Sequence, residues 1–285
     1  MTTVEYSRLK KYFIYLISAA LIVLSGCKTN PPNAPDDIGT GKIFLNIKLQ
    51  TPAKTGAADK TVLLEDFANV SCIPCVKSNK IIESFTNVRY GSSKLVAAKF
   101  STNFPSPNDP FYLAIPEICD ARMLYYNIFF APTTIIDGIL YPTSTDSVDV
   151  ILKIDERLAL SPQFGLEVTD SSAGGNYFIN VTLQEINTTG LNLDEIVLHT
   201  VITETDIEFE NPPGSNGETK FYDVVRSTLP TLNGESVANI VQKGEISYEI
   251  AETLSTSWDM NHVHTVVYIQ NTVNKEVYQA GSTIE

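Results

Sequence analysis

Two cysteines three positions apart are the residues of this sequence best suited to chemistry. Cys72 and Cys75 stand in the stretch "DFANVSCIPCVKS", directly after an apolar run. A Cys-x-x-Cys pair can exchange disulfides with another protein, supply half of a metal site, or form a static disulfide that stabilises the fold. Which of these applies depends on the compartment and on the elements that position the two side chains.

The beginning of the chain predicts the compartment. Arg8, Lys10 and Lys11 precede the apolar run "YFIYLISAALIVLSG", which stops at Cys27. A basic start followed by an apolar run of this length is typical of a secretory signal, and the run is short for a transmembrane helix. The sequence "LSGC" resembles the lipobox of bacterial lipoproteins, whose cysteine is lipidated and becomes the first residue of the mature chain.

This resemblance implies a signal peptide over residues 1–26 and a mature chain anchored to the lipid bilayer of the cell envelope by acyl groups on Cys27. Lys28 follows in place of the aspartate associated with inner-membrane retention, which favours the outer membrane. The alternatives are an uncleaved anchor or a cysteine without such a role. Disulfides persist in an extracytoplasmic compartment.

The charge excludes one class of partner. The formal net charge is -13 over 285 residues, and removal of residues 1–26 takes away three positive charges and one negative charge, which leaves -15. Such an acidic surface repels phosphate backbones. We therefore expect no nucleic acid as a partner.

A metal site is the least favoured use of the cysteine pair. Zinc would need two further thiolate or imidazole ligands. Cys119 lies within a helical pattern as a small apolar residue, and His262 and His264 lie far downstream on one expected strand face. We expect neither a metal nor a cofactor at the pair.

The pattern from Thr61 onward is that of an α/β domain. Before it, residues 28–40 predict a flexible tether and "KIFLNIKL", residues 42–49, predicts a first strand. The α/β elements are the strands "TVLLEDF" and "KLVAAKF", a helix from the cysteines to about Thr86, a helix to about Asn127, the hairpin "TTIIDGILYP", and a closing helix after the cap Asp146.

After Ser161 the pattern changes to strands that alternate apolar and polar residues, separated by turn-rich stretches such as "SSAGG" and "NPPGSNGE". Strands at this spacing predict an antiparallel β-sandwich. We therefore expect a lipidated N-terminus and linker (27–58), an α/β domain (59–161) and an all-β antiparallel, sandwich-like domain (162–285). The last should fold alone, because its strands follow one another by short turns.

The position of the cysteine pair is more informative than the pair itself. A thiolate at a helix N-terminus is stabilised by unpaired amides and the helix dipole. Asp66 lies six residues before Cys72, on the strand that leads into the helix, and Pro132 precedes a strand in "FFAPTTIIDG". With the order β-α-β-α-β-β-α over about 100 residues, these features resemble the thioredoxin fold.

The thioredoxin resemblance implies a role for five residues. Cys72 would be the nucleophile and Cys75 would resolve the mixed disulfide. Asp66 would be a buried carboxylate that manages protons, and Pro132 would be a cis-proline facing the cysteines. Ala131 would offer its backbone to an extended substrate strand.

Some residues differ from the thioredoxin pattern. Ser71 stands where many thioredoxins carry tryptophan, and Ile73-Pro74 replaces the usual Gly-Pro between the cysteines. That dipeptide helps to set the reduction potential, so the direction of electron flow stays open. Asp66 could also point to solvent while Glu65 takes the inner position.

A longer resemblance extends to the C-terminus. The stretches "VLLEDFANVSCIPC", "ARMLYYNIFFAPTTIIDG", "FYDVVRSTLP" and "HTVVYIQNTVNKEVYQAG" resemble the outer-membrane-protein-28-related family of lipoproteins, from about Thr61 onward. This family is thioredoxin-like at its N-terminal end and continues with a β-rich domain. The resemblance implies the fold and the anchor more directly than an activity.

Two functions remain. The first is a lipid-anchored thiol-disulfide oxidoreductase that acts on exported proteins with thiols or disulfides and is served by a further redox partner. The second is a binding or structural surface lipoprotein in which Cys72–Cys75 is a static disulfide. We favour the first, because the Cys-x-x-Cys pair and the Ala-Pro-Thr stretch around Pro132 are both intact.

Overall fold

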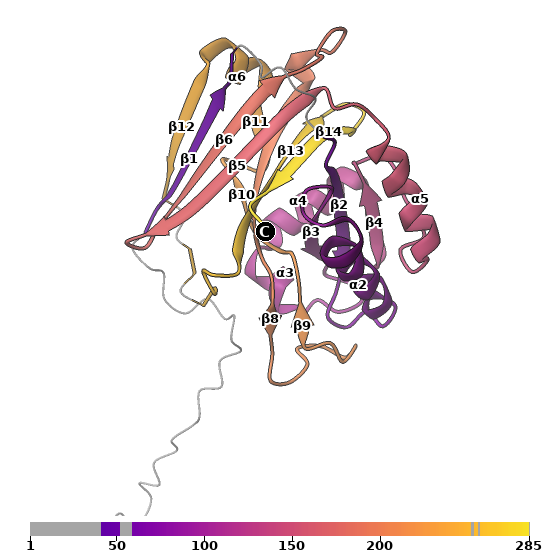
Figure 1. The fold of residues 1–285 in the computed structure, drawn as a ribbon. Helices are drawn as coiled ribbons and strands as arrows, with labels where there is room; N and C mark the ends of the chain where they lie inside the picture. Colours follow the sequence, from indigo (N-terminus) through magenta and orange to yellow (C-terminus); the bar gives the residue numbers. More distant parts are fainter. Residues whose placement is uncertain (1–40, 52–58, 252–253, 256, 285) are drawn as a thin grey trace, which may run out of the picture. The chain divides into compact units, whose positions relative to one another are not determined.

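The computed structural model describes residues 41–51, 59–251, 254–255 and 257–284 (Figure 1). Cys27, the expected lipidation site, and the expected signal peptide lie outside the described residues. The fold is mixed α/β, with mostly sheets and few helices. Within the described ranges, no helix has both the length and the apolar character that crossing a membrane requires. We call residues 59–161 the α/β part and residues 162–284 the β-rich part.

The α/β part contains the strands and helices in the expected order. Its central strand β2 (Val62–Ala68) pairs in parallel with β3 (Leu95–Ser101) and in the antiparallel direction with β4 (Thr133–Ile136). β2 and β3 are buried on both faces, which explains their nearly continuous apolar sequence. Alternate residues of β2 therefore face two different layers of helices.

The helices of the α/β part cover both faces of this strand set. On one face, β2 packs with α2 (Cys75–Ser84), its continuation η1 (Phe85–Tyr90) and α5 (Ser147–Leu158). On the other face it packs with α4 (Pro116–Tyr126), which follows the short α3 (Pro110–Ala114). As expected, the Asp146 side chain caps α5.

Helix α2 begins later than the sequence suggested. Its first residue is Cys75, with Pro74 as the N-cap, and Cys72 lies in the turn before it. The Cys75 amide donates to the Cys72 carbonyl (3.2 Å) and the Val76 amide to the Ile73 carbonyl (3.3 Å). These i to i+3 bonds form a tighter turn than an α-helix. Cys72 thus starts the turn that leads into the helix.

The expected hairpin after Pro132 is also shorter than predicted. Asp137 and Gly138 form the turn with φ angles of 45° and 76°, the left-handed values that such a turn requires. Only one bridge, between Ile136 and Leu140, remains of the second strand. Gly138 has a second reason to lack a side chain, because a Cβ atom there would lie 1.9 Å from the Lys275 carbonyl oxygen.

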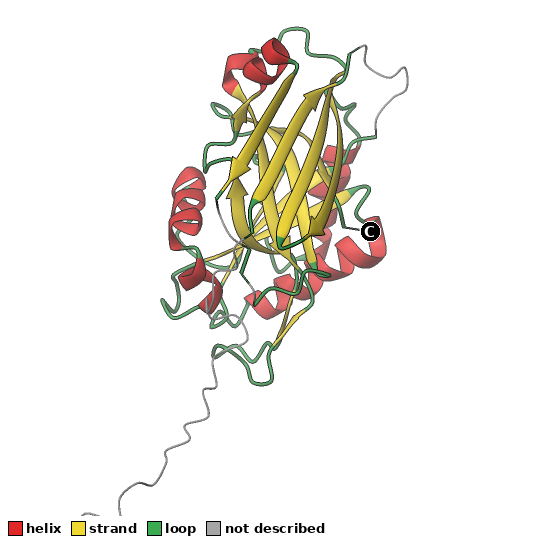
Figure 2. Ribbon diagram, turned by 90° about the vertical axis from the view of Figure 1, so that its left-hand side faces the viewer, coloured by secondary structure: helices red, strands yellow, loops and turns green. Residues whose placement is uncertain are grey.

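The β-rich part contributes to two sheets, whose strands Figure 2 shows in yellow. A four-stranded sheet has the order β12-β1-β6-β5, and an eight-stranded sheet has the order β14-β13-β7-β10-β3-β2-β4, with β11 paired to β7. The bounds are β1 (Ile43–Leu49), β5 (Phe164–Ala173), β6 (Asn176–Glu185), β7 (Ile196–Glu204), β10 (Val224–Leu229), β11 (Glu235–Ser236), β12 (Glu245–Ile250), β13 (Val263–Asn271) and β14 (Val277–Ser282). The remaining elements are η2 (Leu193–Glu195), the small β8 (Ile207–Glu208) and β9 (Lys220–Phe221) pair, and α6 (Val237–Lys243).

The expectation that the β-rich part needs no upstream strand is wrong. Strand β1 lies between β6, to which it is parallel, and β12, to which it is antiparallel. The eight-stranded sheet also continues across residue 161, because β10 pairs in parallel with β3. The pairing is therefore not all antiparallel. The physical reason is that, without β1 and β3, backbone groups of β6, β12 and β10 would lack hydrogen-bond partners.

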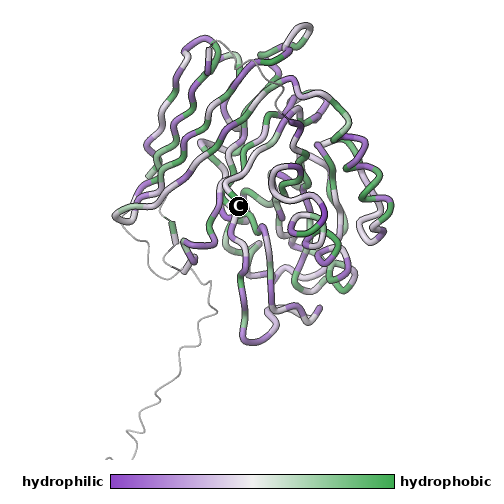
Figure 3. Tube along the Cα trace, viewed as in Figure 1, coloured by the Kyte–Doolittle hydropathy of each residue, from purple (hydrophilic) through white to green (hydrophobic). Residues whose placement is uncertain are grey.

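One apolar cluster joins the four-stranded sheet to β7 and β13. Its members from β1 are Ile43, Leu45 and Ile47, each no more than 1% exposed, and it includes residues of β6, β7 and β13. Buried and less buried residues alternate along β1 and most of β6, and Figure 3 shows apolar and polar residues mixed along the strands of the four-stranded sheet. Strands β7 and β13 are instead buried along almost their whole length. The expected strand at residues 42–49 is confirmed, and it contributes to the core rather than to a linker.

Candidate functional site

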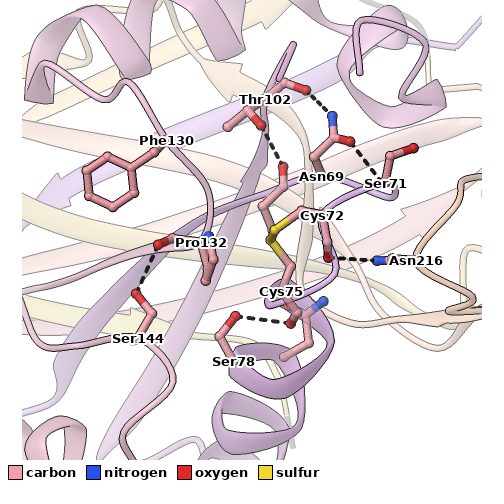
Figure 4. Close-up of a disulfide and its surroundings, with 12 residues drawn as sticks. Asn69, Ser71, Cys72, Cys75, Ser78, Thr102, Phe130, Pro132, Ser144 and Asn216 are labelled. Atoms are coloured by element: carbon pink, nitrogen blue, oxygen red, sulfur yellow. Dashed lines mark hydrogen bonds between the residues drawn. A yellow bond between two sulfur atoms is a disulfide. The ribbon is translucent and has the colours of Figure 1, made fainter. Parts of the chain in front are cut away.

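The cysteine pair lies in the loop between β2 and α2. The structure joins Cys72 and Cys75 by a disulfide, with a Cα–Cα distance of 5.3 Å (Figure 4). Both residues are buried, Cys72 at 2% exposure and Cys75 at 0%. The Ser78 hydroxyl donates to the Cys75 carbonyl at 3.1 Å.

Two polar side chains that the sequence analysis did not identify fix the loop before the disulfide. The Asn69 amide group donates to the carbonyls of Thr102 (2.6 Å) and Ser106 (2.9 Å) and accepts from the Ser71 amide (2.9 Å). Asp109 accepts from the Val70 amide at 2.8 Å. Asx side chains are strong local hydrogen-bonding groups, and Asn69 directly after a strand is a signal that could have indicated this.

Asp109 connects the cysteine loop to the helices of the other face. Besides Val70, it accepts from the amides of Phe111 (2.9 Å) and Tyr112 (3.2 Å), as the N-cap of α3. Burial raises the pKa of this carboxyl, although its three backbone hydrogen bonds act in the opposite direction. The Asp-Pro sequence at the start of α3 is the pattern that predicts such a cap.

Pro132 lies near the cysteine loop (Figure 4). The Ala131–Pro132 peptide bond is cis, and Pro132 immediately precedes β4. Pro132 and Pro74, the residue before Cys75, line the same cavity of about 480 Å³. Ala131 is half-buried at the start of this segment.

The surface around this cavity is apolar. Ile73, between the cysteines, is 64% exposed, and Phe129 and Phe130, just before Ala131, are 80% and 68% exposed. Phe130 also lines the cavity, whose walls carry no charged side chain. Exposed large apolar side chains that gather at one place indicate contact with another molecule. The sequence analysis did not select them, since single apolar residues before a strand carry no such signal.

Asp66 and Glu65 occupy opposite faces of β2, and both are fully buried. Glu65 is satisfied by Arg122 (2.6 Å) and by the Tyr126 hydroxyl (2.6 Å). The alternative in which Asp66 points to solvent is wrong. Asp66 accepts one hydrogen bond, from the Thr134 hydroxyl at 2.8 Å, and its second oxygen has no hydrogen-bond partner among the described residues.

The environment of Asp66 changes its protonation. Burial raises the pKa of Asp66 to about 6, although the charge of Lys99 and the Thr134 hydroxyl lower it. Lys99 is the residue opposite Asp66 on β3, and its amide donates to the Asp223 carbonyl (2.8 Å). Burial likewise raises the pKa of Asp223 to about 6, against the charge of Lys99. Carboxyl groups with a pKa near neutrality can take up and release protons.

Replacing Asp66 with asparagine should remove a pH dependence of stability. The folded-state pKa of Asp66 is raised from 3.8 to about 6. The protonated carboxyl therefore contributes to the free energy of unfolding in full below about pH 4, and this contribution is lost as the pH rises through 6. The shift corresponds to roughly 3 kcal/mol. The difference in free energy of unfolding, Asp66→Asn minus wild type, should therefore increase by roughly that amount between pH 4 and pH 7.

Denaturant titrations at several pH values measure this difference. Asp194→Asn, at an exposed position in η2, is the control. A pH-independent difference for Asp66→Asn would contradict the assignment of Asp66 as a buried, titrating carboxyl.

The other candidates from the sequence occupy less reactive positions. Cys119 is a buried residue of α4, as expected, and burial raises the pKa of its thiol to about 12, so it is protonated at neutral pH. His264 lies on β13 and His262 just before it. Within the described ranges, no three His, Cys, Asp or Glu side chains are grouped so that they could hold a metal ion.

Comparisons with known proteins find structural neighbours only. No family model and no curated protein matches the chain. HBP35 of Porphyromonas gingivalis is similar with a TM-score of 0.66 and 13% identity, over 81% of this chain and 76% of that chain. A protein from Agrobacterium tumefaciens has a TM-score of 0.47 and 11% identity, over 80% of this chain and 95% of that chain.

The likeness to HBP35 concerns the fold alone, because the sequences are so different. In the present chain, β2, α2, β3, α4, β4 and α5 follow one another in the order that the sequence analysis predicted. By fold, the chain is similar to HBP35 over most of its length.

Proposed function

We propose that the protein exchanges thiols and disulfides with exported proteins through Cys72 and Cys75. The observation that carries this proposal is the place of the disulfide. It lies at the start of α2, next to a cavity lined by Pro74, Pro132 and the exposed Phe130. Ile73, between the cysteines, and Phe129, before Phe130, are exposed as well. An apolar, uncharged surface beside a disulfide is suited to contact with an unfolded polypeptide that carries a cysteine.

The exchange starts from the disulfide present in the structure. A thiolate of the partner attacks Sγ of Cys72, the bond between Cys72 and Cys75 breaks, and Cys75 leaves as a thiolate that takes up a proton. The second partner thiolate then attacks the partner's own sulfur in the mixed disulfide and releases Cys72. Two electrons pass to the pair, and the partner gains a disulfide. A redox partner of the thiol-disulfide class restores the pair by the same steps.

The same exchange runs in the opposite direction when the pair is reduced. The Cys72 thiolate attacks a partner disulfide, and the Cys75 thiolate resolves the mixed disulfide. Asp66 serves as the proton carrier for Cys75. Its carboxyl lies on the face of β2 that α2 covers, and its pKa of about 6 allows both protonation states near neutral pH. Ala131 presents its backbone to the partner chain.

A static disulfide is the competing function. The observation that favours it is the burial of both cysteines. The reduction potential of the pair discriminates between the two. A value well below about -300 mV is typical of a structural disulfide, whereas a higher value is typical of an exchanging one. We expect the higher value, and a lower one would remove the proposed exchange.

We also propose that the chain is an outer-membrane lipoprotein of the outer-membrane-protein-28-related family, anchored through acylated Cys27. The support is the "LSGC" stretch and the motifs around the cysteine pair and in the β-rich part. Replacing Cys27 with alanine should abolish incorporation of a labelled fatty acid, because the lipobox cysteine is the residue that carries the acyl groups. Labelling of the expressed protein in bacteria, followed by fluorography, measures this. Cys119→Ala is the control and should retain the label. Equal labelling of Cys27→Ala would contradict the anchor.

A further inference from the structure

The connection between β8 and β9, residues 209–219, lies against the cysteine loop. Gly214 touches the loop backbone directly, because a Cβ atom at this position would lie 2.2 Å from the Val70 carbonyl oxygen. The Asn216 amide donates to that same carbonyl at 3.2 Å. Only a residue without a side chain allows so close an approach. We call residues 209–219 the β8–β9 loop.

The contact continues to the first cysteine. The Ser215 amide donates to the Ser71 hydroxyl at 3.2 Å. Nδ2 of Asn216 donates to the Cys72 carbonyl at 3.5 Å, as Figure 4 shows. Three successive residues of the β8–β9 loop thus contact three successive residues of the cysteine loop, ending at Cys72.

Asn216 is itself held in place from α2. Its Oδ1 accepts from the Glu218 amide (2.9 Å), and its Nδ2 donates to a Glu218 carboxylate oxygen (2.6 Å). The same carboxylate accepts from the Asn79 amide group of α2 at 2.9 and 3.1 Å. The β8–β9 loop is therefore bound to the chain before the disulfide and to the helix after it.

The base of the β8–β9 loop belongs to the β-rich part. Val70 packs in one apolar cluster with Phe111, Ile207, Phe209, Phe221 and Val224. Ile207 and Phe221 form the β8–β9 pair, and Val224 starts β10, the neighbour of β3. A change in the β-rich part can reach the cysteine loop through these contacts.

We propose that Asn216 is a positioning residue for the cysteine loop, and that the β8–β9 loop restricts access of attacking thiols to Cys72. With the loop in place, Cys72 is 2% exposed. Since thiol-disulfide exchange requires direct access to a sulfur atom, the bound loop slows attack and its release speeds attack. The inference rests on the proposed function in one respect: where the pair exchanges disulfides with exported proteins, the β8–β9 loop regulates that exchange.

Asn216→Asp tests the positioning role with little change in shape. It keeps the oxygen that accepts from the Glu218 amide and replaces the donor to Cys72 and Glu218 with an oxygen that repels both. Reduction of the disulfide by dithiothreitol should become roughly fivefold faster, the change that the loss of one hydrogen bond supplies. Asn192→Asp is the matched control, because Asn192 makes the same contacts with the Asp194 amide and the Glu195 carboxylate, away from the cysteines.

Gly214→Ala tests the same role by a different route. The added Cβ would collide with the Val70 carbonyl and push the loop away, which should also speed reduction. Gly281→Ala is its control, since a Cβ there meets only ordinary contacts of 3.7 Å or more. Unchanged rates in folded Asn216→Asp and Gly214→Ala would overturn the proposal.

Hydrogen exchange of the unmodified protein gives a readout that depends on no variant. The amides of residues 209–219 should exchange faster after the disulfide is reduced, because the Cys72 carbonyl then moves with its freed side chain. Equal exchange in both redox states would overturn the coupling. The reduction potential, measured in the same samples, tests the proposed function separately. A low potential with faster amide exchange after reduction indicates a static disulfide with a restricting loop. A higher potential with equal amide exchange in both redox states indicates an exchanging disulfide without such a loop.

Discussion

Exported proteins covalently attached to Cys72 should accumulate in cells that express Cys75→Ser. In the mixed disulfide, Cys75 is the nearby thiol that resolves the bond, with its Cα 5.3 Å from that of Cys72 in the disulfide form. Serine cannot attack a disulfide, so release must await an outside thiol. The apolar surface around Phe129 and Phe130 should slow release further. Non-reducing gels of acid-quenched cells should show high-mass bands that collapse on reduction.

Two variants control this experiment. The bands should disappear in the Cys72→Ser, Cys75→Ser double variant, because no nucleophile remains at the site. They should persist when Cys119→Ser is added to Cys75→Ser, since Cys119 is buried in α4 and its thiol pKa is raised to about 12. An absence of bands for Cys75→Ser, together with a fully oxidised wild-type pair in cells, would favour the static disulfide.

The local parts of the site could be predicted from the sequence, because each has a short-range signal. The apolar run of β2, the cysteines before α2 and the segment from Pro132 into β4 all lie where the pattern indicated. The resemblance to the thioredoxin fold then supplied their arrangement. Whether Asp66 or Glu65 faced solvent could not be decided in this way, because a strand buried on both faces has no solvent side.

The parts that the sequence analysis missed depend on residues far apart in the chain. Pairing of β1 with β12 joins residues about 200 positions apart, and nothing in either segment specifies the partner. The "NPPGSNGE" stretch reads as an ordinary turn, yet Gly214 and Asn216 contact the cysteine loop about 144 residues upstream. Asn69 and Asp109 have local signals, but their bonds to Ser106 and Val70 join segments 37 and 39 residues apart, which those signals do not specify.

The β-rich part, expressed alone as residues 162–285, should not fold cooperatively. The fragment lacks β1, so β6 and β12 each lose a neighbouring strand. The buried side chains of Ile43, Leu45 and Ile47 are lost from the apolar cluster. Burial of each contributes roughly 1.5–3 kcal/mol, and the sum is comparable with the whole stability of an ordinary domain, about 5–15 kcal/mol.

The fragment also loses the partners of buried polar groups. Gln270 of β13 accepts from Arg122 (3.0 Å) and donates to the Tyr126 hydroxyl (2.8 Å), both in α4. β10 loses β3 and becomes an open edge, which favours aggregation. Thermal unfolding followed by circular dichroism and by Trp258 fluorescence should give one shared transition for the chain from residue 32 onward and none for the fragment. A cooperative transition in residues 162–285 would mean that β1 and β3 are docked onto a core that is already complete without them.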